Sequence, residues 1–189
     1  MQPKEDHYVS RAAHKLDTVA KVLALDFNAK TVLDVGASSG GFSEYALRHG
    51  AAKVIAVEKG TDQLNPQLRL NPKLESHEKT DIRSFHSDNK IDIVLIDVSF
   101  VSLEEILPAV CKMVDSDSII IAMAKPQFET KDQKLKHKGI IKNERIRRQL
   151  LLNLELWLKQ YFVIQAKADS LLSGVKGNRE RFYKLKLAK

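Results

Sequence analysis

The sequence of 189 residues has one cysteine, no long apolar run and no apolar leader, and each absence excludes a class of protein. The single cysteine, Cys111, cannot build the internal disulfide framework of small secreted domains, and no Cys/His cluster has zinc-ligand spacing. The longest apolar run, 119–124, is far short of the roughly 20 residues that span a bilayer. The first seven residues are polar, unlike a signal peptide. We therefore expect a soluble, cytoplasmic globular protein that binds no metal.

The composition favours a folded, basic protein. Hydrophobic residues make up 43% and charged residues 29%, which is enough apolar material for a packed core. Lysine and arginine number 31 against 24 acidic residues, so the net charge is +7. A basic surface favours nucleic acid or anionic lipid as partner, although proteins that touch neither carry similar charges.

Short β-branched runs alternate with helix-length stretches through the first two thirds of the chain. Predicted strands lie at 31–35, 53–57, 91–96 and 118–123, and predicted helices at 41–48, 62–70 and 103–114. The strands are almost continuously apolar, as in strands covered on both faces. This alternation predicts βαβ units in a parallel, doubly wound α/β sheet.

The two ends of the chain extend this pattern. A helix is predicted at 143–161, followed by strands at 162–168 and 181–187 that pair antiparallel because no crossover helix joins them. A further helix is expected between Tyr8 and Leu25. By analogy, a seven-stranded, mostly parallel sheet with an antiparallel C-terminal strand is the Rossmann-like architecture of class I S-adenosylmethionine methyltransferases. We expect an N-terminal helical extension, 1–27, and a methyltransferase domain, 28–189.

A glycine-rich turn follows the first predicted strand, where nucleotides bind in open parallel sheets. The dinucleotide pattern G-x-G-x-x-G fails, because Ser38 stands where its second glycine belongs. Asp34 would repel a pyrophosphate but suits a ligand that carries ammonium and sulfonium groups, so S-adenosylmethionine fits better than NAD. The candidate cofactor-binding residues are Asp34, Gly36, Ala37, Ser38, Gly40, Gly41, Phe42, Glu58, Asp81 and Asp97.

Two of these candidates have specific expected roles. Glu58 lies 24 residues after Asp34, at the end of the next strand, where a carboxylate grips ribose hydroxyls. Asp81 could approach the adenine edge. The alternatives are an ordinary surface glutamate beside Lys59 and a solvated loop aspartate.

Five motifs in order resemble the TlyA (haemolysin A) family of FtsJ-like ribose methyltransferases. They are Tyr8-Val-Ser-Arg-Ala-Ala-His-Lys15, Asp34-Val-Gly-Ala-Ser-Ser-Gly-Gly-Phe42, Asp97-Val-Ser-Phe-Val-Ser102, Lys125-Pro-Gln-Phe-Glu129 and Gly177-Asn-Arg-Glu180. The resemblance implies a ribosomal RNA 2′-O-methyltransferase that uses S-adenosylmethionine, with a catalytic tetrad at Lys15, Asp97, Lys125 and Glu180. Members usually begin with an S4 RNA-binding domain, and we expect this chain to lack one.

The residues themselves give partial support to that tetrad. Asp97 follows a buried strand and Lys125 follows a fully apolar one, so both should lie near the cofactor crevice, although Asp97 could cap a helix and Lys125 could be a structural lysine. Lys15 and Glu180 rest on the resemblance alone. Our hypothesis makes Lys125 the general base, Asp97 and Lys15 orienting or tuning groups, and Glu180 an anchor for substrate or lysine.

Basic residues crowd two segments, 125–148 and 176–189, which flank the proposed catalytic residues. These residues predict a phosphate-binding rim that would bind ribosomal RNA or a ribosomal subunit. The alternative interpretation is a solvated loop and a solvated helix face. The rival functions are a non-catalytic RNA-binding module, a membrane-active haemolysin and a small-molecule O-methyltransferase.

Overall fold

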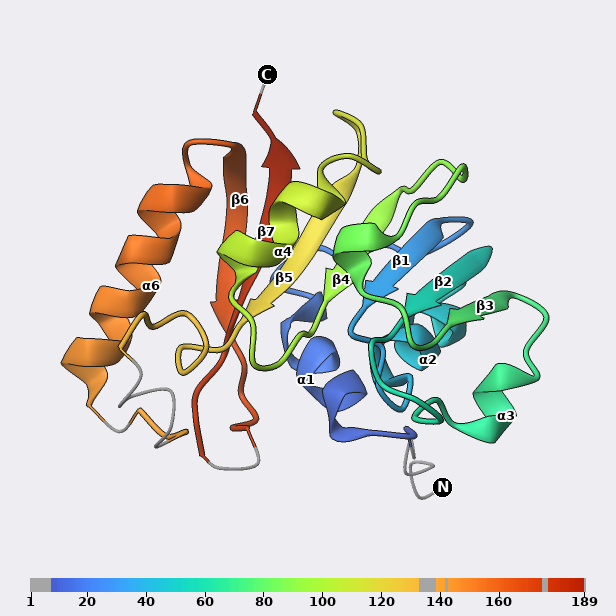
Figure 1. Ribbon diagram of the computed structural model, residues 1–189, viewed down its shortest axis with the longest axis horizontal. Coiled ribbons are helices and arrows are strands. Elements are labelled where there is room, and N and C mark those ends of the chain that lie inside the picture. Colours follow the sequence, from blue (N-terminus) through green and yellow to red (C-terminus); the bar gives the residue numbers. More distant parts are fainter. Residues whose placement is uncertain (1–7, 133–138, 142, 175–176, 189) are drawn as a thin grey trace.

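The computed structural model describes residues 8–132, 139–141, 143–174 and 177–188 (Figure 1). Seven strands form one sheet in the order β3-β2-β1-β4-β5-β7-β6. The strands are β1 (Thr31–Val35), β2 (Lys53–Val57), β3 (Leu74–His77), β4 (Ile93–Ile96), β5 (Ile119–Ala124), β6 (Phe162–Asp169) and β7 (Arg181–Leu187). The first five run parallel, whereas β7 is antiparallel to both β5 and β6. The predicted fold class is therefore confirmed.

Helices cover both faces of the sheet. They are α1 (Arg11–Ala20), α2 (Gly41–Arg48), α3 (Pro66–Arg69), α4 (Leu103–Val110) and α6 (Glu144–Leu158), with a short 3₁₀ turn η1 (Ile82–Ser84). Leucines of α4 and α6 share one apolar core with Leu33 and Val94 of the sheet. On the other face, α1 and α2 pack over Val32 and Leu95. The central strands are buried on both faces, which explains their almost continuously apolar sequences.

Several predicted boundaries were wrong for identifiable reasons. The helix expected at 62–70 is only Pro66–Arg69, because Asn65 caps it and Pro66 opens it. The helix expected from Tyr8 to Leu25 is only Arg11–Ala20, where Ser10 accepts the first hydrogen bond. Strand β3 is not predicted from the sequence, because its residues Leu-Glu-Ser-His lack an apolar run.

The N-terminal segment packs directly on α2 and the sheet. Ala13, Leu16 and Val19 of α1 are buried in the core that includes Phe42. A Cβ atom at Gly41 would come within 2.0 Å of the Ser10 hydroxyl oxygen, so glycine permits the close approach of the two helices. The division at residues 27 and 28 remains a prediction. Within the described ranges, no helix has the length and apolarity needed to cross a membrane.

Candidate active site

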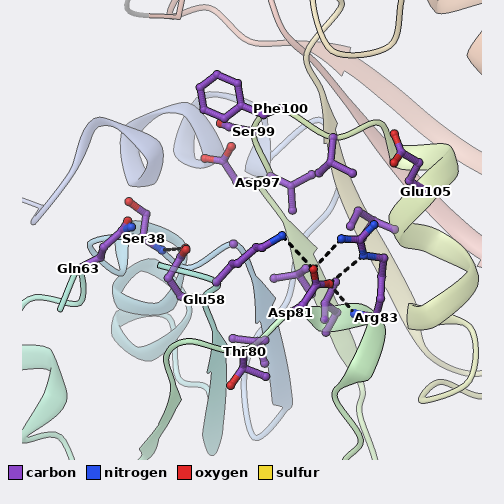
Figure 2. A pocket seen from close by; sticks show the side chains of 18 residues that line it. Ser38, Glu58, Gln63, Thr80, Asp81, Arg83, Asp97, Ser99, Phe100 and Glu105 are labelled. Carbon is purple, nitrogen blue, oxygen red and sulfur yellow. Dashed lines mark hydrogen bonds and ion pairs between the residues drawn. The ribbon is translucent and has the colours of Figure 1, made fainter. Parts of the chain in front are cut away.

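A cavity of about 610 Å³ opens where β1, β2 and β4 end (Figure 2). This is the sheet edge at which open α/β folds bind ligands, because the strand order reverses there. Gly36 forms part of the lining with a φ of +80°. A Cβ at this position would lie 2.7 Å from the backbone oxygen of Asp97, so the loops after β1 and β4 approach each other as only glycine permits.

Glu58 and Asp81 also line this cavity, but they are held differently. Glu58 accepts backbone N–H bonds from Ser38 (2.9 Å) and Gly60 (2.6 Å), which fix its carboxylate. Asp81 accepts side-chain bonds of 2.7 and 2.9 Å from Arg83 and lies 3.3 Å from the Lys59 amine (Figure 2). The hydrogen bonds from Arg83 hold the pKa of Asp81 well below its usual range.

The structure brings Gly36, Ser38, Glu58, Asp81 and Asp97 to the cavity, but not the other candidate cofactor residues. The five absent from its lining are Asp34, Ala37, Gly40, Gly41 and Phe42. A Cβ at Gly40 would meet leucine side chains at 2.6 and 2.7 Å, and Phe42 is 2% exposed in the core. Gly40 and Phe42 therefore shape the loop through internal packing.

Asp34 is fully buried beneath the glycine-rich loop. Its Oδ2 accepts a 2.7 Å hydrogen bond from the Ser43 hydroxyl, while Oδ1 has no hydrogen-bond partner among the described residues. Burial raises the pKa of Asp34 to about 7, and the negative charges of Asp97 and Glu58 act in the same direction. The negative charges of Asp97 and Glu58, at adjacent strand ends, make this region favourable for a positively charged ligand.

The four residues of the expected tetrad form two ion pairs. Lys125 Nζ lies 2.6 Å from Asp97 Oδ1 and donates a 2.8 Å hydrogen bond to the Ser99 hydroxyl. Lys15 Nζ lies 2.6 Å from Glu180 Oε2, with both side chains nearly buried. Burial raises the pKa of Glu180; Lys15 lowers it, as does Lys125, while Asp97 raises it. Members of both ion pairs thus shift the pKa of the same carboxyl group, that of Glu180. The four residues come from separate parts of the chain: α1, the ends of β4 and β5, and the position before β7.

Sequence reasoning missed Ser99 and Phe100. Figure 2 shows both beside Asp97 on the loop after β4. Phe100 is 85% exposed and has a φ of +68°, which is rare for an aromatic residue and marks backbone strain. Its ring lies 5.1 Å from that of Phe128, on the loop after β5. Phe100 belongs to the motif Asp97–Ser102 of the family resemblance, and a large aromatic residue shortly after a candidate catalytic aspartate was the signal that could have identified it.

The predicted basic rim is only partly present. Arg147 was expected on it but is buried, and it donates to Asp169 (2.8 Å) and to the backbone oxygen of Arg179 (3.0 Å). Arg181 is likewise bound to Asp169 at 2.6 Å. Both therefore serve the fold. Six of the expected lysines lie outside the described residues: Lys134, Lys136, Lys138, Lys142, Lys176 and Lys189.

Comparison with known proteins agrees with this geometry. The profile of the FtsJ-like methyltransferases matches residues 8–187. The chain belongs to the FtsJ-like methyltransferase family. It is 35% identical over 178 residues to the 23S rRNA (cytidine-2′-O)-methyltransferase TlyA of Campylobacter jejuni, covering 93% of this chain and 70% of that protein. It is 34% identical to the 16S/23S rRNA (cytidine-2′-O)-methyltransferase TlyA of Mycobacterium tuberculosis, covering 94% of this chain and 68% of that one.

Solved structures share this fold. A candidate hemolysin from Streptococcus thermophilus has a TM-score of 0.91 at 30% identity, covering all of this FtsJ-like chain and 70% of that one. A candidate S-adenosylmethionine dependent methyltransferase from Listeria monocytogenes has a TM-score of 0.67 at 18% identity, covering 95% of this chain and all of that one. Throughout the described parts of the chain, no group of three or more His, Cys, Asp or Glu residues could hold a metal ion.

Proposed function

We propose that this FtsJ-like protein transfers a methyl group from S-adenosylmethionine to a ribose 2′-hydroxyl of ribosomal RNA. The observation that carries the proposal is the convergence of two ion pairs, Lys125–Asp97 and Lys15–Glu180, beside the cavity. Asp97 lines the cavity, and the charges of Asp97 and Lys125 both shift the pKa of Glu180. The family supports methyl transfer, and the names of the relatives support a ribosomal RNA substrate. Such a substrate would place the enzyme in the cytoplasm, with the ribosomes.

The cavity residues fit S-adenosylmethionine. Glu58 has both carboxylate oxygens fixed by backbone N–H groups and retains acceptor capacity for ribose hydroxyls. Asp97, which lines the cavity, favours the positive charges of the donor, while the glycine at position 36 lets the loop after β1 approach the backbone of Asp97. When bound, S-adenosylmethionine supplies a methyl group whose bond to a positively charged sulfur breaks as the new oxygen–carbon bond forms, leaving a neutral thioether.

The side chains of this protein would activate the hydroxyl group. A ribose hydroxyl is a poor nucleophile until its proton is shared, and a positioned general base contributes about 10²–10⁴-fold. We assign that role to Lys125, whose amine, once it has released its own proton to solvent, would take the hydroxyl proton as the oxygen attacks. Asp97 holds this amine at 2.6 Å, and Glu180 holds the second amine, that of Lys15, at the same distance. The role of Glu180 is thus to anchor Lys15.

The surface around these groups suits RNA. The net charge is +7, and Phe100 offers an exposed ring next to the Asp97–Lys125 pair. Sequence-specific RNA recognition relies on unstacked bases that stack on aromatic side chains. A single exposed aromatic residue beside a general base therefore suits a nucleotide that is turned out of its helix.

The test replaces Lys125 with alanine. We expect Lys125→Ala to abolish methyl transfer to ribosomal RNA while S-adenosylmethionine still binds by calorimetry, because the cavity lining is unchanged. Lys53→Ala is the matched control, since Lys53 also makes a 2.6 Å ion pair, with Glu75, but far from the cavity. Turnover retained by Lys125→Ala would remove this lysine from the mechanism.

A further inference from the structure

Lys125 is held by two oxygen atoms on one short loop. Its Nζ lies 2.6 Å from Asp97 Oδ1 and 2.8 Å from Ser99 Oγ, and these are its contacts among the described residues. Asp97 and Ser99 both follow β4 and both line the cavity, whereas Lys125 follows β5. The amine of Lys125 is thus held by the Asp97 and Ser99 side chains, both on the loop after β4, the strand next to β5. The backbone of this loop fixes the distance between the two side chains.

A neutral lysine amine has two N–H bonds and one lone pair. A single acceptor, such as the Asp97 carboxylate, leaves the amine free to rotate about its Cε–Nζ bond and to point the lone pair in many directions. Two acceptors at different positions engage both N–H bonds and thereby fix the lone pair. The hydroxyl of Ser99 supplies the second acceptor, so the lone pair points away from both oxygens.

We propose that Ser99 is a positioning residue, whose hydroxyl acts with Asp97 to aim the amine of Lys125 at the substrate hydroxyl. The inference rests on the proposed function, because it needs Lys125 as the general base. It assigns Ser99 no proton transfer of its own. The Ser99 side chain is exposed, so its removal leaves no core cavity and its hydrogen bond to Lys125 is the interaction lost.

The first test separates turnover from binding. Ser99→Ala should lower kcat by about 10- to 100-fold, since small misplacements of catalytic groups cost up to about 10²-fold. The KM for RNA, the Kd for S-adenosylmethionine and the Tm should stay unchanged. Ser99→Thr keeps the hydroxyl and should restore kcat. Ser102→Ala is the control: its hydroxyl lies 3.1 Å from Glu105 at the start of α4, so this variant should lower Tm and leave kcat unchanged.

The outcomes that would overturn the proposal are distinct. Unchanged kcat in Ser99→Ala would show that the hydroxyl is not needed, and a raised KM at constant kcat would make Ser99 a substrate contact. Failure of threonine to restore kcat would point to shape rather than hydrogen bonding.

A second measurement needs no substrate. In ¹⁵N-lysine-labelled protein, the side-chain ¹⁵Nζ signal of Lys125, assigned by its loss in Lys125→Arg, should be sharp in the wild type and in Ser99→Thr but broadened in Ser99→Ala. An unchanged signal in Ser99→Ala would refute the positioning role. Wild-type protein that shows the expected signals yet methylates no RNA would refute the proposed function and leave the positioning of Lys125 intact.

Discussion

Breaking the Lys15–Glu180 pair should destabilise the protein in a manner that depends on pH. Lys15 Nζ and Glu180 Oε2 are 2.6 Å apart, and the two side chains are 11% and 3% exposed. Removing one partner of a buried pair costs about 3–5 kcal/mol, because the remaining charge is left without compensation. Lys15→Met removes the amine with little change of volume. We expect a loss of about 3 kcal/mol in the free energy of unfolding at pH 8.

The pH dependence follows from the direction of the Glu180 pKa. Burial already raises this pKa above its ordinary value of 4.5, and loss of Lys15 raises it further. A carboxyl group whose pKa is higher in the folded state stabilises the fold at low pH, and this contribution is lost as the pH rises through the folded-state value. The deficit of Lys15→Met should therefore be small near pH 5 and grow toward pH 8.

Urea unfolding followed by circular dichroism between pH 5 and 8 measures this effect. The double variant Lys15→Met/Glu180→Gln replaces the carboxyl group by a neutral amide, so its deficit should be smaller and independent of pH. Lys53→Ala, which breaks a more exposed ion pair, should cost less than 1 kcal/mol. A deficit in Lys15→Met that is constant with pH, or equal to that of the double variant, would refute the reasoning.

Two further predictions concern Asp34 and Phe100. Burial raises the pKa of Asp34 from its ordinary value of 3.8 to about 7, so the folded state retains a proton that the unfolded chain releases. At about 1.4 kcal/mol per pH unit, this group should lower the free energy of unfolding by roughly 4 kcal/mol between those values. In the same urea series, Asp34→Asn should abolish the contribution of this group to the slope of the unfolding free energy against pH. An unchanged slope would contradict the raised pKa of Asp34. Phe100→Ala should raise the KM for RNA by about 5- to 100-fold, since base stacking is worth about 1–3 kcal/mol. Steady-state kinetics would test this, and unchanged kinetics would exclude a stacking role.

The sheet could be predicted because its strands are chemically uniform. Runs such as 93–96 and 119–124 are apolar throughout, and the short loop between β6 and β7 allows only antiparallel pairing. Strand β3 could not be predicted because it lies at the sheet edge, where Leu74 alone is buried and the other three side chains are partly or fully exposed. Edge strands need no continuous apolar run.

The site could be predicted only in part. Asp97 and Lys125 follow apolar strands, so their position at the sheet edge was readable from the sequence. The pairing of Lys15 with Glu180 could not be predicted from the residues themselves, because Glu180 lies 165 positions after Lys15 and only the fold brings them together.

The buried role of Arg147 was missed although the sequence contained a signal. Arg147 shares the buried face of α6 with Leu151, Leu154 and Leu158, a spacing of four, three and four residues. A charged residue in register with an apolar stripe indicates a buried ion pair, here with Asp169. Counting basic residues along the chain concealed this periodicity.

Methyl transfer to ribosomal RNA is tested most directly with the substrate itself. Ribosomal subunits and free ribosomal RNA should be incubated with the full chain and with labelled S-adenosylmethionine, and any 2′-O-methyl group mapped. We predict label at a ribose 2′-oxygen with wild-type protein and none with Lys125→Ala. Label in protein or small molecules, with none in RNA, would contradict the central claim.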